Sequence, residues 1–510
     1  MRRPDLMRPK SMKRRRRRVQ IPDELIMSRS KRKVSPCQQD SQGSETQMLS
    51  GPSLPEDILW HIHSLLPMQD AAQAACACHA FLKSWRCHPN LTFDIKTFGL
   101  NVDAHEDHIA SEFCIKVDHI MKNRSDVGVK TLDICMPCGR KAKYFRYLNS
   151  WLQIAVKPGI EKLSLLLPME AKYEFPYSLL SNGSGDSIRY LRLADCSFCP
   201  TAELGPFRRL TKLYLSSVRI TEEGLGCFLS NSLALQRLEI YNCITLVSLK
   251  IPCTLQQLGY LEVSGCSRLK LIDSKASTLS VFRYCGCSKI QLSIETLQVK
   301  NLSLAFPNAV YYTRVKLPFS MPNLEIVTIY SCSEVSTPVL PSKFLHLRHL
   351  IIDLAGFGLS AAYDYLSLVS FLGACPSLET FVLKVKEERM KHISIFADPA
   401  DLRKMKRQYH QNLKNVKFLG FISAKSMVEL ACHVVENIKS LECLTLEAGQ
   451  SDISCSTPGN KLGRCTPVPR NVLVEARRAI LAIRTYIVPK VPSTVKLHIV
   501  EPCSCHAGEF

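Results

Sequence analysis

The sequence predicts an α/β protein in which a short helical segment precedes a curved solenoid whose strands form one parallel sheet. Three observations predict this. A pair of apolar residues separated by one residue recurs through most of the 510-residue chain, an apolar stripe at helical spacing precedes the first pair, and Lys and Arg are concentrated before that stripe. A segment of about 40 residues buries little surface alone, so the helical stripe either packs on the solenoid or is offered to a partner.

The recurring unit has the form Leu-x-Leu, with other apolar residues at some positions. From Leu191 to Leu350 the steps are 22, 25, 23, 21, 20, 25 and 23 residues, which is the period of leucine-rich repeats. One unit cannot bury its own strand, but stacked units form one continuous core. The pairs are Leu132/Ile134, Leu163/Leu165, Leu191/Leu193, Leu213/Leu215, Leu238/Ile240, Leu261/Val263, Phe282/Tyr284, Leu302/Leu304, Val327/Ile329, Leu350/Ile352, Phe381/Leu383, Val416/Phe418 and Leu444/Leu446.

The residue between the two apolar positions points to the opposite side of its strand, so these middle residues predict the concave face of the solenoid. Their mixed, partly charged character suits protein recognition, and they contain no ordered catalytic set. The predicted row is Arg192, Tyr214, Glu239, Glu262, Arg283, Ser303, Thr328, Ile351 and Val382.

Cysteine recurs with the same period. In five units it stands three residues after the second apolar position, where a leucine-rich repeat needs a small residue that turns the chain and hydrogen-bonds to the next coil. We expect the chain's 23 cysteines to be reduced and mostly buried, because no secretory signal peptide is recognisable. The five cysteines are Cys196, Cys243, Cys266, Cys287 and Cys332.

The stripe lies on a helix that begins at Pro55, which suits a first helical turn. It consists of Ile58, Leu59, Ile62, Leu65 and Leu66. Glu56 and Asp57 then lie at the positive end of the helix dipole, and Pro67 ends the helix. Asp70 is the expected cap of a second helix that runs towards Trp85.

The C-terminal part predicts a strand at 413–419, a helix at 424–437 and a strand at 441–446. A further helix is expected at 470–488 and a last strand at 495–500. These elements would cap the end of the solenoid, where an open apolar edge invites aggregation.

The basic tail holds two clusters separated by twelve residues. Residues 1–33 contribute +11 of the formal net charge of +21, so the rest of the chain is only mildly basic. This arrangement is typical of a bipartite nuclear localisation signal, and predicts nuclear localisation with the cytoplasm as a second location. A solvated, disordered extension without an address is the alternative. The clusters are Lys13, Arg14, Arg15, Arg16, Arg17 and Arg18, then Lys31, Arg32 and Lys33.

Three groups of cysteines could be read as metal ligands: Cys135/Cys138, Cys196/Cys199 and Cys503/Cys505/His506. A structural zinc site needs four ligands, normally as two close pairs in one small unit, and these groups lie far apart. No phosphate-binding glycine loop and no local Cys–His signature is present. We therefore expect no cofactor, no metal and no enzymatic activity, and no apolar run is long enough to span a membrane.

Residues 54–91 resemble the F-box of plant F-box proteins, on LPEDIL (54–59), Ile62, SLLPMQDAA (64–72) and FLKSWR (81–86). The resemblance implies binding to the Skp adaptor of a Skp–cullin–F-box ubiquitin ligase. The adaptor-facing set that it implies is Leu54, Pro55, Ile58, Leu59, Ile62, Leu65, Leu66 and Pro67.

The C-terminal part resembles the FBD-type module of many plant F-box/leucine-rich-repeat proteins. The predicted organisation is thus a disordered basic tail at 1–52, an F-box at 53–94, a leucine-rich-repeat solenoid at 95–408 and an FBD-like cap at 409–510. The residues that carry the match are His410, Leu413, Val416, Gly420, Glu429, Leu430, Glu436, Asn437, Leu441 and Glu442.

These features predict a non-catalytic substrate receptor, in which the F-box binds a Skp-type adaptor, and through it a cullin, while the repeats bind an unknown target protein. The alternative is a nuclear scaffold or nucleic-acid-associated protein without a ligase role, which the basic tail motivates. A third option is a small molecule on the concave face, for which the predicted row shows no Arg/Lys cluster.

Overall fold

The computed structural model describes residues 55–77, 79–125, 128–137, 142–169, 171–181, 183–201, 204–294, 298–355, 363–386, 392–397, 401–403, 405, 410–449 and 470–501. They belong to one structural unit that begins at Pro55. The two basic clusters of the predicted nuclear localisation signal lie outside the described residues.

A main sheet of 15 parallel strands runs through this unit. Each strand is separated from its neighbour by a crossover connection, so the sheet follows the order of the chain. Its strands are β1 (Asn90–Phe93), β2 (Thr131–Cys135), β3 (Lys162–Leu166), β4 (Tyr190–Ala194), β5 (Lys212–Ser216), β6 (Arg237–Tyr241), β8 (Tyr260–Ser264), β10 (Val281–Cys285), β12 (Asn301–Ala305), β13 (Ile326–Ser331), β14 (His349–Ala355), β15 (Thr380–Lys386), β16 (Asn415–Phe421), β17 (Cys443–Ala448) and β18 (Lys496–Val500).

The register of the main sheet aligns the apolar pairs. Leu132 pairs with Leu163, and the alignment continues strand by strand to Leu444 and Leu497. The predicted pairs all lie on strands and are buried, which confirms the repeat register. Burial of one such side chain contributes roughly 1.5–3 kcal/mol, so these stacked rows stabilise the sheet far more than the ion pairs on its surface.

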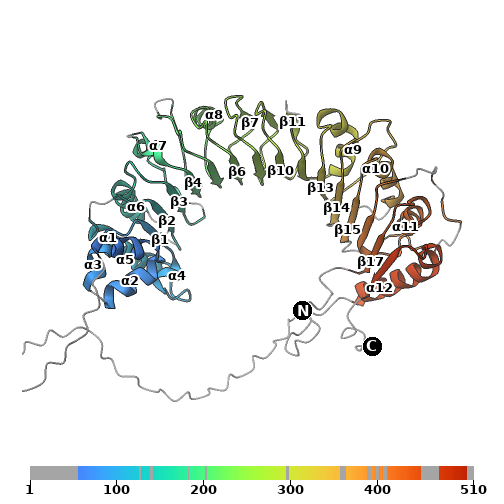
Figure 1. Ribbon diagram of the computed structural model, residues 1–510, viewed down its shortest axis with the longest axis horizontal. Helices are drawn as coiled ribbons and strands as arrows, with labels where there is room; N and C mark the ends of the chain where they lie inside the picture. Colours follow the sequence, from blue (N-terminus) through green and yellow to red (C-terminus); the bar gives the residue numbers. More distant parts are fainter. Residues whose placement is uncertain are drawn as a thin grey trace, which may run out of the picture. The chain divides into compact units, whose positions relative to one another are not determined.

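A second sheet of three parallel strands was not predicted from the sequence. It contains β7 (Ser248–Ile251), β9 (Leu271–Ser274) and β11 (Gln291–Ile294), in the order β11-β9-β7. These strands belong to coils whose connections are too short for a helix, and the backbone of each connection pairs with the next one instead. Figure 1 shows this sheet on the convex side of the main sheet.

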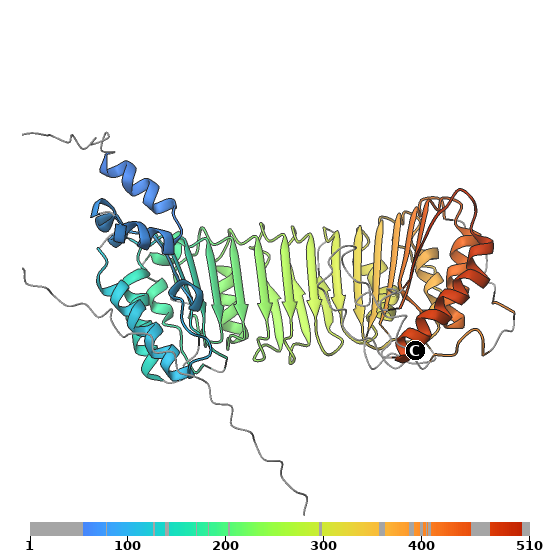
Figure 2. The same cartoon turned by 90° about the horizontal axis from the view of Figure 1, so that it is seen from below.

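Helices lie in most of the remaining connections, although the described residues between β13 and β14 form none. Figure 1 shows the helices between strands on the convex side of the main sheet, and Figure 2 shows the strands face-on. Among the described helices, none is long and apolar enough to cross a membrane. The helices are α1 (Glu56–Leu65), α2 (Met68–Ala77), α3 (His79–Arg86), α4 (Ile95–Phe98), α5 (Glu106–Lys122), α6 (Ala142–Ala155), α7 (Ser184–Ser187), α8 (Glu222–Ser230), α9 (Ala309–Ser320), α10 (Val369–Ala374), α11 (Lys425–Asn437) and α12 (Arg470–Ala482).

The turn after each strand decides which of the five predicted cysteines are buried. Four residues that directly follow β4, β5, β6 and β8 have left-handed backbone angles: Asp195, Ser217, Asn242 and Gly265. Cys196, Cys243 and Cys266 come directly after such a residue and are buried, and the thiol of Cys243 donates to the carbonyl of Leu215 in the neighbouring coil (3.9 Å). Cys287 and Cys332 follow residues without these angles and are exposed, so the prediction is wrong for these two.

Residues 56–86 form three short helices, where the sequence predicted two. Helix α1 ends before Pro67, as expected. Helix α2 already begins at Met68, and the amide of Ala71 donates to the carbonyl of Pro67 (2.9 Å), so Asp70 lies inside the helix and does not cap it. Met68 of α2 and Trp85 of α3 line the same pocket, which one straight helix could not achieve.

The C-terminal part extends the main sheet through β16, β17 and β18, with α11 and α12 in the connections. The predicted elements are present, with boundaries shifted by one or two residues. Helix α12 is followed by a π-helical turn (Ile483–Ile487) and a 3-10 turn (Val488–Lys490), where the sequence predicted one continuous helix to residue 488.

Buried polar contacts fasten this part. Glu475 of α12 accepts hydrogen bonds from the amide of Ser423 (2.6 Å) and from Nε2 of His392 (3.0 Å). Burial alone would raise the pKa of Glu475, but the hydrogen bonds from His392 and Ser423 lower it below its usual value. Upstream, the buried guanidinium of Arg314 donates to the carbonyls of Ser370 (3.2 Å) and Leu340 (2.6 Å) and so ties α9 to α10 and the preceding loop.

Candidate functional site

Helix α1 presents an apolar ridge to solvent. The helix follows Pro55 and carries Glu56 in its first turn. Four large apolar side chains along it stay exposed, and three of them share one side of the helix by their spacing: Ile58 (42%), Ile62 (40%) and Leu65 (71%). These three residues are the α1 ridge, and the fourth, Trp60 (41%), lies outside it. Several apolar side chains exposed together on one short helix are typical of a surface that another protein covers.

The other predicted adaptor-facing residues lie beside this ridge. Leu59 and Leu66 are half-buried, whereas Pro55 and Pro67 are exposed. Leu54 lies outside the described residues. The structure therefore brings the described members of the predicted set together on α1 and at its two ends.

The opposite face of α1 is held by His63, which is buried. Its ring stacks on Phe81 of α3 with a centroid distance of 5.2 Å, and its Nε2 donates to the carbonyl of Ala71 in α2 (2.9 Å). One side chain of α1 thus contacts both following helices. This contact fixes which face of α1 turns inward and leaves the α1 ridge outside.

A second histidine connects these helices to the main sheet. The ring nitrogens of His88 lie 3.3 Å from the carbonyl oxygen of Leu66 and 2.9 Å from that of Asn90, the first residue of β1. Burial lowers the pKa of His88, so the ring is neutral at neutral pH, and its single N–H can donate to only one of these two carbonyls. The amide of Asn90 also donates from Nδ2 to the carbonyl of Ser64 (3.2 Å), which joins the end of α1 to the first strand.

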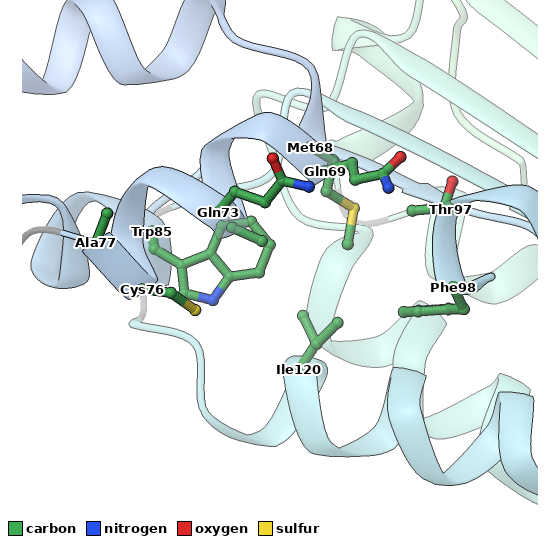
Figure 3. Close-up of a pocket in the computed structure, with 10 residues that line it drawn as sticks. Met68, Gln69, Gln73, Cys76, Ala77, Trp85, Thr97, Phe98 and Ile120 are labelled. Carbon is green, nitrogen blue, oxygen red and sulfur yellow. The ribbon is translucent and has the colours of Figure 1, made fainter. Parts of the chain in front are cut away.

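An open apolar pocket of about 500 Å³ lies between α2 and α3 on one side and α4 and α5 on the other (Figure 3). Trp85 and Phe98 face it from opposite sides, with Met68 above and Ile120 below in this view. Its polar groups are few, chiefly the amides of two glutamines and one hydroxyl. With the α1 ridge, this pocket gives the N-terminal helices two adjacent uncovered apolar surfaces.

On the main sheet, the predicted middle residues form one row in register. Arg192 pairs with Tyr214, and the row continues through Glu239 and Glu262 to Arg283. These residues lie on the face opposite to the buried leucines, which is the concave face (Figure 1). The register of this predicted row is therefore confirmed.

Arginine and tyrosine side chains stack along this face. The guanidinium of Arg192 lies 4.6 Å from the ring centroid of Tyr214, and that of Arg237 lies 3.7 Å from the centroid of Tyr260. Tyr214 in turn contacts Tyr241, with their centroids 5.1 Å apart. The whole group, the tyrosine–arginine patch, consists of Arg192, Tyr214, Arg237, Glu239, Tyr241, Tyr260, Glu262 and Arg283.

The two carboxylates of the patch are already hydrogen-bonded. Glu239 accepts from Nε of Arg237 and from the hydroxyl of Tyr241 (2.9 Å), and Glu262 accepts from the hydroxyl of Tyr260. Burial, and then the hydrogen bond to Glu262, raise the pKa of Tyr260 to about 12. Tyr260 is thus a neutral hydrogen-bond donor at physiological pH, and these hydrogen bonds fix the side chains of the patch in place.

Other groups that could carry chemistry are not assembled into a site. Among the described residues, no three His, Cys, Asp or Glu side chains are placed to hold a metal ion. Cys138 and the terminal group Cys503/Cys505/His506 lie outside the described residues. Cys196 is in the core, and burial raises the pKa of its thiol to about 12, the opposite of what a nucleophile needs.

The sequence reasoning missed two parts of these surfaces. It named the middle residue of each strand and expected its neighbours to share the concave face, but it did not name the flanking residues Arg237, Tyr241 and Tyr260. The period of two predicts that they face the same side, because residues i and i+2 of a strand share a face. It also assigned no structural role to His63, although the place of this residue among apolar neighbours was a signal of burial.

A long parallel sheet whose successive coils bury aligned apolar rows at this period defines a leucine-rich-repeat protein. The family model described as "At1g61320/AtMIF1, LRR domain" matches residues 120–504. The chain therefore belongs to this family of plant leucine-rich-repeat proteins. A search of curated proteins found no match.

Proposed function

We propose that the chain is a non-catalytic substrate receptor of a Skp–cullin–F-box ubiquitin ligase. Residues 53–94 act as the F-box that binds a Skp-type adaptor, and the concave face binds a target protein. The observation that carries this proposal is the α1 ridge, which resembles the adaptor-facing part of an F-box in sequence and is exposed in the fold.

The adaptor side of the proposal is supported by the energetics of the ridge. Covering one large apolar side chain contributes roughly 1.5–3 kcal/mol, and partial exposure leaves much of this gain for a partner. The pocket of Figure 3 adds further uncovered apolar area beside the helices. Because His63 and His88 hold the helices in place, little ordering cost opposes binding.

The target side is supported by composition. Tyrosine and arginine are the residues that most often dominate protein interfaces, and the tyrosine–arginine patch contains three tyrosines and three arginines. It lies on strands β4 to β10, several strands away from α1. Two separate surfaces in one structural unit can bind two proteins at once, so a target is held at high effective concentration near a conjugating enzyme carried elsewhere in the complex.

The test is recovery of a purified plant Skp adaptor by the tagged full-length chain. We expect wild-type chain to recover the adaptor, and a variant with Leu54, Pro55 and Ile58 changed to Ser to lose it. A control variant changes two other exposed apolar residues, Phe319 and Val339, to Ser and should bind normally. Circular dichroism shows whether the repeats stay folded. Unchanged recovery by the triple variant would mean that the assigned interface is wrong.

The basic tail favours a second candidate, a nuclear scaffold that associates with nucleic acid without a ligase role. Residues 1–33 hold a charge of +11, and such tails bind phosphate backbones with a steep salt dependence. Binding of DNA or RNA that disappears on removing residues 1–33, together with no recovery of the adaptor, would favour this candidate. Nuclear import of a fluorescent fusion that needs both basic clusters tests the localisation separately.

A further inference from the structure

The tyrosine–arginine patch has a distinct order of charges. Its middle row runs Arg192, Tyr214, Glu239, Glu262 and Arg283 on five neighbouring strands. A cation therefore stands at each end and two carboxylates stand between them. A ligand that crosses these strands meets positive, negative and positive charge in turn.

The two arginines at the ends of this row form no ion pair within the described part of the chain. Arg192 stacks on Tyr214 and Arg283 lies over Tyr260 (5.6 Å to the centroid), and among the described residues no carboxylate forms an ion pair with either one. Nε of Arg192 is covered and has no acceptor. Stacking fixes the plane of a guanidinium while its terminal N–H groups stay available for a bidentate acceptor.

The arginine between them is different. Arg237 also lies over Tyr260, but its Nε is bound to Glu239. The hydrogen bond to Glu239 raises the pKa of Arg237, so the pair is satisfied within the protein. Only the two ends of the row are thus open to an anionic ligand group.

The spacing of the ends fits a peptide. Neighbouring strands lie about 4.8 Å apart, so four steps from β4 to β10 place the two arginines about 19 Å apart. An extended chain rises about 3.3 Å per residue. Two acidic side chains about six residues apart on an extended segment would therefore reach both arginines.

The middle of the patch selects what lies between the two anions. The carboxylates of Glu239 and Glu262 would repel a third negative group. Their oxygens and the hydroxyl of Tyr241 instead suit hydrogen-bond donors such as amides and hydroxyls. A single-stranded nucleic acid has a phosphate at every nucleotide and would place charge directly over the carboxylates, so charge complementarity favours a peptide.

We infer that the tyrosine–arginine patch binds an extended protein segment that carries two acidic side chains about six residues apart, with uncharged hydrogen-bonding residues between them. This inference rests on the proposed role of the concave face in binding the target. The acidic groups can be carboxylates or phosphorylated side chains, because both accept bidentate hydrogen bonds from arginine.

The test uses the full-length chain and fluorescein-labelled nine-residue peptides in a fluorescence anisotropy titration. The first peptide has Glu at positions 2 and 8 and Ser, Asn and Thr between them. Three comparison peptides have Gln at both positions, Glu at positions 2 and 5, or phosphoserine at positions 2 and 8. We expect the first peptide to bind at least tenfold more tightly than the Gln peptide and more tightly than the closely spaced one, and the phosphoserine peptide shows which acidic group is preferred.

Variants distinguish binding at the tyrosine–arginine patch from nonspecific attraction to the positive charge of the chain. Arg192→Gln and Arg283→Gln should each weaken binding of the first peptide by about tenfold, which corresponds to one charged hydrogen-bonded contact. Lys417→Gln removes an exposed cation from the same row on β16 and should leave the affinity unchanged. Arg192→Lys keeps the positive charge but lacks the paired N–H donors of the planar guanidinium, so it should retain only part of the affinity that Arg192→Gln loses.

Equal affinity for the Glu and Gln peptides overturns the inference, as does equal binding by the arginine variants and Lys417→Gln. Tighter binding of a single-stranded RNA nonamer that needs Arg192 and Arg283 would assign the patch to nucleic acid and also overturn it. Recovery of the Skp adaptor should be normal for both arginine variants. Loss of adaptor binding with intact peptide binding would refute the proposed ligase role and leave the patch assignment standing.

Discussion

Acid should weaken the C-terminal part of the protein through a buried pair of histidines. His410 and His433 are each 6% exposed, and among the described residues neither Nε2 has a hydrogen-bond partner. Burial, and then the nearby His433, lower the pKa of His410 from 6.5 to about 4. One pKa unit corresponds to about 1.4 kcal/mol, so protonating His410 in the folded protein costs about 3 kcal/mol.

The direction follows from proton uptake. Between pH 6.5 and pH 4 the unfolded chain binds a proton at His410 that the folded chain does not, so the free energy of unfolding falls as the pH is lowered. Linkage gives a loss of about 2 kcal/mol between pH 7 and pH 5 from this side chain. Burial also lowers the pKa of His433, which adds to the loss in the same direction.

The assay is urea unfolding followed by circular dichroism at pH 7 and pH 5. Replacing His410 by Phe removes its titration, so the variant should lose about 2 kcal/mol less than wild type over this interval. His108→Phe changes an exposed histidine of α5 and should behave like wild type. If the free energy of unfolding of His410→Phe falls as much between pH 7 and pH 5 as that of wild type, His410 is not the side chain whose protonation weakens the fold.

Three further substitutions test the packing, each by urea unfolding at pH 7. Glu475→Gln should cost about 3 kcal/mol, because it breaks a buried charged contact with His392. Repeated at lower pH, the difference in the free energy of unfolding between wild type and Glu475→Gln should vanish below the lowered pKa of Glu475. A difference that does not change with pH would contradict this. Arg314→Leu should cost about 3 kcal/mol by leaving buried carbonyls without donors, whereas a loss under 1 kcal/mol would mean that water replaces the guanidinium. Gly420→Ala should cost at least about 2 kcal/mol, since the residue has φ +75° and a Cβ would lie 2.0 Å from the carbonyl oxygen of Val385; a neutral result would exclude that close approach.

The sequence predicted the main sheet well because its signal is repeated. Each Leu-x-Leu pair occupies the same position in successive coils, so errors at one unit are corrected by its neighbours. Strand β1 was missed because Leu91 and Phe93 directly follow a helical segment and lie far from the next pair at Leu132. The second sheet was missed because it contains only β7, β9 and β11. The apolar positions of these three strands do not recur in the other repeats, so no repeated pattern indicates them.

The surfaces were predicted less completely. The spacing of Ile58, Ile62 and Leu65 indicated one helical stripe, but spacing alone does not show which stripe faces solvent, and the answer depends on His63 and its contacts with α2 and α3. On the concave face the middle row followed from the repeat. The stacking of arginine on tyrosine between strands did not, because it depends on side-chain conformations that a repeat pattern does not contain.

Hydroxyl-radical footprinting of the full-length chain, with and without a purified Skp adaptor, tests the central proposal most directly. This mass-spectrometric measurement reports how accessible individual side chains are. If the α1 ridge binds the adaptor, labelling of Ile58, Ile62 and Leu65 should fall when the adaptor is added. Labelling of the exposed Phe319 should stay the same. Unchanged labelling of the α1 ridge in the presence of saturating adaptor would contradict the proposal.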